Sequence, residues 1–161
     1  MVLLGGKILA SLFIAYGDFK ERKILLLVLI GLFIINGLES FLFVDSVEVL
    51  TLILVNISVI SIIFGLTYLY FNKVRKVPNP SQTHLGIGDW LFFITLSPLF
   101  PTSVFIYVFL LMNVISLVVA IIATVIKNGK YEIPYAGISA VVFIVISVIQ
   151  YMYPLEILSL I

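Results

Sequence analysis

Two aspartates, Asp18 and Asp89, are the residues of this 161-residue sequence best placed to do chemistry. Each lies at the junction between a charged or polar segment and an apolar run. Two neighbouring carboxyl groups cannot both ionise at low cost, so one keeps its proton while the other stays charged. The charged carboxylate takes a proton from water, and the protonated one polarises a peptide carbonyl. If the fold brings them together, the pair suits acid–base hydrolysis of a peptide bond, with no metal and no covalent intermediate.

Each aspartate also has a simpler structural explanation. Asp89 follows a polar loop and precedes an apolar helix, so its side chain would cap the N-terminus of that helix. Asp18 stands among cations and would be an ordinary charge at the membrane boundary. Gly86 and Gly88, which precede Asp89, let the backbone bend and let another chain, such as a substrate strand, approach closely.

The composition indicates that membrane spans must position these residues. Hydrophobic residues make up 63% of the chain, and only 11% are charged, against about 25% in soluble domains. This excludes a soluble enzyme, a basic nucleic-acid-binding surface and a disordered tail. With no cysteine and a single histidine, we expect no disulfide framework, no metal site and no cofactor.

The uncharged runs predict an all-α polytopic membrane protein of about six transmembrane helices with short loops, forming one domain over residues 1–161. About 20 helical residues cross a hydrocarbon core of roughly 30 Å. Pro98 and Pro101 divide the fourth span, which is short, from the fifth. The expected spans are roughly 2–17, 24–43, 48–71, 89–100, 103–126 and 134–154.

Six spans place the loops 18–23, 72–88 and 127–133 on one side of the membrane. Most of the nine basic residues lie in these loops, so the positive-inside rule makes that side cytoplasmic and places both aspartates at the cytoplasmic boundary. Lys7 falls on the opposite side, where we expect its side chain to reach the interface.

Polar side chains within the spans have a structural interpretation. The amides of Asn36, Asn56, Asn113 and Gln150 lie inside apolar runs. We expect them to form hydrogen bonds between helices rather than to handle substrate.

Three motifs, in order, resemble those of the type IV prepilin peptidase family, which includes the archaeal preflagellin (prearchaellin) peptidases and belongs to the GxGD membrane aspartic proteases. Residues 18–24, DFKERKI, match the first motif, D-x-[RK]-x-[RK]-x-[IV]; residues 86–89, GIGD, match the second. Residues 133–137, IPYAG, are similar to I-P-[FY]-[AG]-P near the last helix, with Gly137 in place of the final proline.

This resemblance implies an aspartic endopeptidase that cleaves the short leader peptide of type IV pilin-like or archaellin precursors. It implies that Asp18 and Asp89 are catalytic and that Gly86 and Gly88 support the motif or the substrate. The implied partners are a prepilin or prearchaellin signal peptide and the lipid bilayer, without nucleic acid. The implied location is the cell membrane, with the active site facing the cytoplasm.

Bacterial members also carry a cysteine-bearing cytoplasmic domain and N-methylate the product. This chain has no cysteine, so the resemblance points to an archaeal-type enzyme without methyltransferase activity. As a hypothesis, the loop 72–88 moves to admit the substrate.

Two other functions stay open. In a small proton- or cation-coupled transporter or channel subunit, the same two acids would handle protons or cations. The chain lacks strongly charged mid-span residues and recognisable inverted repeats, which weighs against that alternative. The other open function is that of a non-catalytic assembly or scaffold protein with the same fold.

Overall fold

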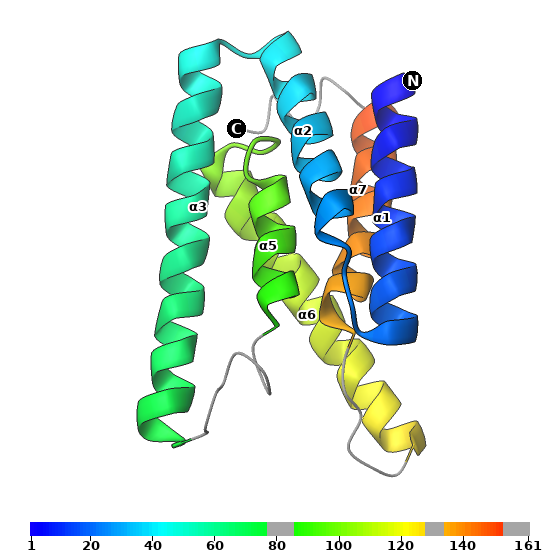
Figure 1. Ribbon diagram of the computed structural model, residues 1–161, viewed down its shortest axis with the longest axis vertical. Helices are drawn as coiled ribbons and strands as arrows, with labels where there is room; N and C mark the ends of the chain where they lie inside the picture. The colour runs from blue at the N-terminus through cyan, green and yellow to red at the C-terminus, as the bar shows by residue number, and fades with distance from the viewer. Residues whose placement is uncertain (77–85, 128–133, 153–161) are drawn as a thin grey trace.

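The computed structural model describes residues 1–76, 86–127 and 134–152, and these segments form a bundle of helices (Figure 1). Five helices are long and apolar enough to cross a membrane, and α5 is a shorter apolar helix. The expected all-α polytopic membrane architecture is therefore confirmed. The helices are α1 (Val2–Glu21), α2 (Leu26–Phe43), α3 (Ser46–Leu69) with its π-helical extension η1 (Tyr70–Val74), α5 (Ile87–Leu96), α6 (Thr102–Lys127) and α7 (Tyr135–Met152).

The core of the bundle is built around α5. Phe92, Phe93 and Leu96 are completely buried, and α5 contacts α2, α3 and α7. The ring of Phe93 also packs edge-to-face on Phe109 of α6, with centroids 4.9 Å apart. Many large aliphatic side chains instead point outward, as expected where the surrounding solvent is lipid. The second half of α5 thus lies inside the bundle, whereas the start of the helix, two residues before Asp89, is exposed at Ile87.

Side chains from α2 donate hydrogen bonds to free carbonyl groups at and just after the C-terminal end of α5. At about 1.5 Å per residue, the ten residues of α5 are roughly 15 Å long, so this helix is shorter than the expected span 89–100. Its last carbonyls lack partners within the helix and lie inside the bundle. Asn36 donates to the carbonyl of Thr95 at 2.7 Å, and Ser40 donates to the carbonyl of Pro98 at 2.6 Å.

Asn56 of α3 also donates hydrogen bonds to free carbonyl groups that follow α5. Its amide donates to the carbonyls of Ser97 and Phe100, both at 2.9 Å. The prediction of hydrogen bonds between helices is therefore confirmed for Asn36 and Asn56. It is wrong for Asn113, whose amide bonds back to Phe109 of its own helix at 2.7 Å. Asn36 and Asn56 bond across helices because the carbonyls at and after the end of α5 lack partners within that helix. Asn113 lies within α6, where its amide bonds to a carbonyl of the same helix.

A buried ion pair joins α1 to α2 at the end of the bundle opposite Asp18. Lys7 forms a salt bridge with Glu39, and the two side chains are 3% and 26% exposed. The expectation that Lys7 reaches the membrane interface is therefore wrong. Lys7 lies on the same face of α1 as Ser11 and Asp18, the face that packs into the bundle, so its ammonium is neutralised there instead.

Candidate active site

Asp18 lies on the inward face of α1. The buried residues of this helix, Lys7, Ser11, Ile14, Ala15 and Asp18, follow the three-to-four-residue spacing of one helical face. This face packs mainly against α7, which runs antiparallel beside α1 (Figure 1). The carboxyl group of Asp18 is therefore directed toward α7 and is only 7% exposed.

The backbone of α7 holds that carboxyl group. The N–H of Gly137 donates to Oδ2 of Asp18 at 2.7 Å. A side chain at position 137 would be crowded, because its Cβ would lie 3.2 Å from this oxygen and 3.1 Å from the ring of Phe19. Glycine thus lets the first turn of α7 approach the last turn of α1.

Asp89 occupies the third position of α5 rather than its N-cap. The N-cap is Gly86, and the carboxyl group of Asp89 reaches back to accept the backbone N–H of Gly86. It also accepts the backbone N–H of Ala136 in α7. The interpretation of Asp89 as an N-cap is therefore wrong in position. The helix starts three residues earlier than that interpretation requires, and the carboxylate makes the return half of a capping box.

Both carboxyl groups consequently meet at the first turn of α7. The amides of Ala136 and Gly137 are consecutive, and each donates to one aspartate. The first N–H groups of a helix have no partner within it, and they carry the positive end of the helix dipole. The two carboxyl groups interact with each other electrostatically, and the charge of Arg22 acts on both.

This arrangement has a definite chemical use. Two interacting carboxyl groups that share little water favour a state in which one is protonated and the other ionised. The ionised group is a general base for water, and the protonated group is a general acid for a carbonyl oxygen. The consecutive amides fix both groups in place without a metal ion.

The two glycines before Asp89 serve close packing in this structure. A Cβ on Gly86 would lie 2.5 Å from Oδ2 of Asp89, and one on Gly88 would lie 2.8 Å from Cδ1 of Ile24. Gly86 has φ −64°, which any residue adopts, so its backbone shows no unusual bend. Gly86 therefore leaves room for the catalytic candidate itself, and Gly88 for the segment that follows α1.

Sequence reasoning missed two contributors to this geometry. Gly17 allows the chain after α1 to fold back, because a Cβ there would lie 2.6 Å from the carbonyl oxygen of Lys23. The amides of Ala136 and Gly137 were missed as ligands of the carboxyl groups, although Pro134 signals a helix start just before them. A backbone N–H group is not marked by any particular side chain in the sequence. Only a helix-start signal such as Pro134 could therefore have pointed to these two amides.

Comparison of the chain with protein-family models, with curated proteins and with solved structures finds no match. The chemistry assigned to the site therefore rests on its own geometry. Among the described residues there is also no group of three or more histidine, aspartate or glutamate side chains able to hold a metal ion. Most of the expected loop 72–88 lies outside the described residues, which resume at Gly86.

Proposed function

We propose that this protein is a membrane-embedded aspartic endopeptidase with Asp18 and Asp89 as its catalytic pair. One observation carries the proposal: two carboxyl groups from helices far apart in sequence converge on consecutive amides at the start of α7. The pair activates a water molecule on one side and polarises the scissile carbonyl on the other. Neither step requires a covalent enzyme intermediate or a cofactor.

The position of the site at one end of a lipid-facing bundle supports the proposed substrate class. A peptide bond reaches Asp18 and Asp89 most directly where a membrane-anchored chain leaves the bilayer. Together with the motif resemblance, this supports cleavage of the short leader peptide of a prepilin-like or prearchaellin-like precursor. We further propose that the product is not methylated.

The orientation in the membrane is part of the proposal. The end of α1 that carries Asp18 and the end of η1 lie at the same end of the bundle (Figure 1). Basic residues follow at both places, including Arg22, Lys23 and Arg75, whereas Asp45 and Glu48 lie at the opposite end. The positive-inside rule then supports an active site that faces the cytoplasm in the cell membrane.

The test is a cleavage assay of purified protein in liposomes with prepilin and prearchaellin precursors. We expect wild type to release the leader and Asp18→Asn and Asp89→Asn each to lose at least 1,000-fold in rate, about 4 kcal/mol of transition-state stabilisation. Asp45→Asn is the matched control. Asp45 caps α3 by accepting the N–H of Val47 at 3.2 Å, and asparagine caps a helix equally well.

Normal turnover by either single variant would refute the catalytic pair. A wild-type protein that cleaves neither precursor, but moves protons or cations across the liposome membrane, would instead establish the transporter function.

A further inference from the structure

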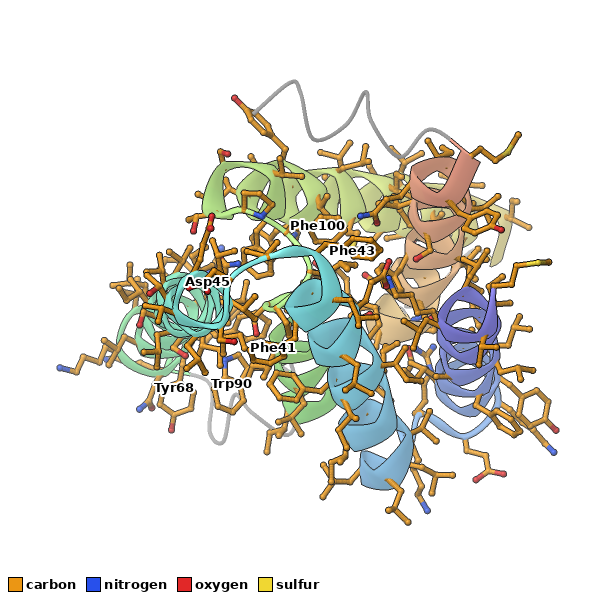
Figure 2. All side chains as sticks on the ribbon, turned by 90° about the horizontal axis from the view of Figure 1, so that it is seen from above. Phe41, Phe43, Asp45, Tyr68, Trp90 and Phe100 are labelled. Carbon is orange, nitrogen blue, oxygen red and sulfur yellow. The ribbon has the colours of Figure 1, made fainter. Side chains whose placement is uncertain are left out.

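Two tyrosine–cation pairs lie at the end of the bundle that carries Asp18. Nζ of Lys20 donates to the hydroxyl of Tyr16 at 2.7 Å, near the end of α1. Nε of Arg75 donates to the hydroxyl of Tyr70 at 3.2 Å, at the end of η1. Seen along the bundle, α1 and α3 lie on opposite sides (Figure 2), so the two pairs are separate from each other. The same arrangement of side chains therefore occurs twice.

The backbone produces this arrangement in two different ways. Lys20 is four residues after Tyr16, which places both side chains on one face of an α-helix. Arg75 is five residues after Tyr70, and in an α-helix it would lie about 140° further around the axis. The π-helical turn reduces this offset, because the N–H of Arg75 bonds to the carbonyl of Tyr70 at 3.1 Å. Such single π-helical turns are rare and occur frequently at functional sites.

Each pair still has hydrogen-bond donors to offer to a ligand. Each tyrosine oxygen accepts from the cation, so its own O–H remains to donate. The ammonium of Lys20 uses one of its three donors in the pair, and the guanidinium of Arg75 uses one of five. Tyr16 and Tyr70 are 61% and 45% exposed, so both pairs lie on the outer surface. A cation beside a phenol O–H suits a phosphate group, because charge-assisted hydrogen bonds to phosphate are strong.

An exposed apolar face leads to each pair. On α1, Leu12 and Phe13 lie four and three residues before Tyr16, and on α3, Leu66 lies four residues before Tyr70. All three apolar side chains are exposed, and in a bilayer they contact acyl chains. The surface therefore matches a ligand in which a phosphate group is joined to acyl chains, which is a phospholipid.

The charge around the pairs favours an anionic phospholipid. Glu21 is the only exposed acid among the described residues at this end of the bundle. The exposed basic residues described there are Lys20, Arg22, Lys23, Lys73, Arg75 and Lys76. A zwitterionic headgroup would bring its own ammonium group into this positive field, whereas an anionic headgroup would not. We propose that the Tyr16–Lys20 and Tyr70–Arg75 pairs are two binding sites for anionic phospholipid headgroups, with the acyl chains along α1 and α3.

Membrane orientation alone does not account for the pairs. The positive-inside rule depends on the number of cations near the ends of the spans and not on hydrogen bonds to tyrosine. Lys23 and Lys76 carry the same charge at the same end, but no tyrosine lies four or five residues before either of them. These two lysines are therefore matched controls for Lys20 and Arg75. The proposal does not depend on the catalytic pair.

The experiment measures lipid binding to the purified protein in detergent micelles by native mass spectrometry. Phosphatidylglycerol is the anionic probe, and phosphatidylcholine is the zwitterionic one. Glycerol phosphate serves as a headgroup without acyl chains. We expect wild type to bind two molecules of phosphatidylglycerol, each about fivefold or more tightly than phosphatidylcholine, the value of one basic residue beside anionic lipid. Glycerol phosphate should compete poorly, because it makes no contact with the apolar faces.

Five variants separate a built site from diffuse attraction. We expect Lys20→Gln and Arg75→Gln each to weaken one of the two sites about tenfold or more, because each removes a charge-assisted hydrogen bond. Lys23→Gln and Lys76→Gln remove the same charge and should each cost less than about threefold, because their charges act through screened solvent. Tyr70→Phe keeps the ring and the guanidinium, and it should weaken one site about three- to tenfold, the value of one neutral hydrogen bond.

Three results would overturn the proposal. Equal affinity of wild type for the two phospholipids would remove the preference for anionic lipid. Equal losses in Arg75→Gln and Lys76→Gln, both eluting as folded protein, would show attraction by diffuse charge instead of a site. Displacement of phosphatidylglycerol by glycerol phosphate at equal affinity would show that the pairs bind an anion without its acyl chains. Since binding is measured without substrate, these results are independent of whether the protein is a peptidase.

Discussion

The backbone N–H of Gly137 lies 2.7 Å from Oδ2 of Asp18 and ties the first turn of α7 to the last turn of α1. Its neighbour Ala136 donates to Asp89, so one helix start positions both carboxyl groups. The separation of the two carboxyl groups is therefore set by backbone geometry in α7. Small changes at this turn should affect catalysis more than stability.

Gly137→Ala tests this dependence. The added methyl group would lie 3.2 Å from Oδ2 of Asp18, so the carboxyl group must shift by a few tenths of an ångström. We expect kcat to fall about tenfold with little change in KM, because displacement of a reacting group by as much as 1 Å costs about 100-fold. Gly37→Ala is the matched control, a buried helical glycine with no atom within 4 Å of its Cβ position. Equal activity of the two variants would contradict the role of Gly137.

Substitution of the two glycines before Asp89 by alanine should lower kcat to different extents. Gly86→Ala places a methyl group 2.5 Å from the carboxylate oxygen of Asp89 and should lower kcat on the order of 100-fold. Gly88→Ala meets only the terminal Cδ1 of Ile24, which can rotate away, so we expect a loss of less than about tenfold.

Steady-state cleavage kinetics on folded, monodisperse protein measure the difference. Ile24→Val removes the opposing methyl group, so it should restore most of whatever activity Gly88→Ala loses and none of the loss in Gly86→Ala. A larger loss in Gly88→Ala than in Gly86→Ala would count against this account.

The Lys7–Glu39 ion pair predicts an asymmetric effect on stability. Glu39→Gln leaves the ammonium of Lys7 buried without its counter-charge, and breaking a buried pair costs about 3–5 kcal/mol. Lys7→Met should cost less, because Glu39 is 26% exposed and retains some hydration. The double variant Lys7→Met/Glu39→Leu should lie nearer to wild type than Glu39→Gln does.

Unfolding in mixed detergent micelles gives these free energies. The Lys7–Glu39 contribution would be refuted by a Glu39→Gln variant as stable as wild type. Cleavage measured on the folded fraction should change little, since the pair lies at the far end of α1 from Asp18.

The hydrogen bonds to the carbonyls that follow α5 should also contribute to the free energy of unfolding. Asn56→Leu removes the donor to the carbonyls of Ser97 and Phe100, and each buried acceptor left without a partner costs about 1–3 kcal/mol. Asn113→Leu makes the same substitution but loses only a bond to Phe109 within its own helix, so it should cost less than about 1 kcal/mol. The same unfolding assay checks both, and equal stability of the two variants would contradict the helix-end role of Asn56.

The proposed orientation can be tested by cysteine labelling, because the chain has no cysteine of its own. Lys76 and Glu48 are exposed and lie near opposite ends of α3 and η1. In right-side-out vesicles, a membrane-impermeant thiol reagent should label Glu48→Cys, whereas Lys76→Cys should react only after the vesicles are opened. Labelling in the reverse pattern would place the two carboxyl groups outside the cell.

The apolar runs were sufficient to predict the helical membrane architecture. Length and charge alone decide whether a helix can cross a bilayer, and the run before Glu39 or the run after Asp45 needs no tertiary partner to be recognised. The ends were less predictable. Helix α1 continues to Glu21, past the expected end at residue 17, because Arg22 ends it in a left-handed conformation (φ 54°) that the charge pattern does not reveal.

The sequence by itself determined that Asp18 and Asp89 lie near the same membrane boundary, because the alternation of spans and basic loops depends only on local composition. Only the tertiary structure decided that both carboxyl groups converge on α7, and that Lys7 is paired with Glu39 instead of reaching the interface. The physical reason is that these contacts use backbone N–H groups and buried charges, whose partners depend on which helices pack together. Helix packing in a lipid-facing bundle is set by close shape complementarity, and hydrophobic periodicity along one helix does not encode it.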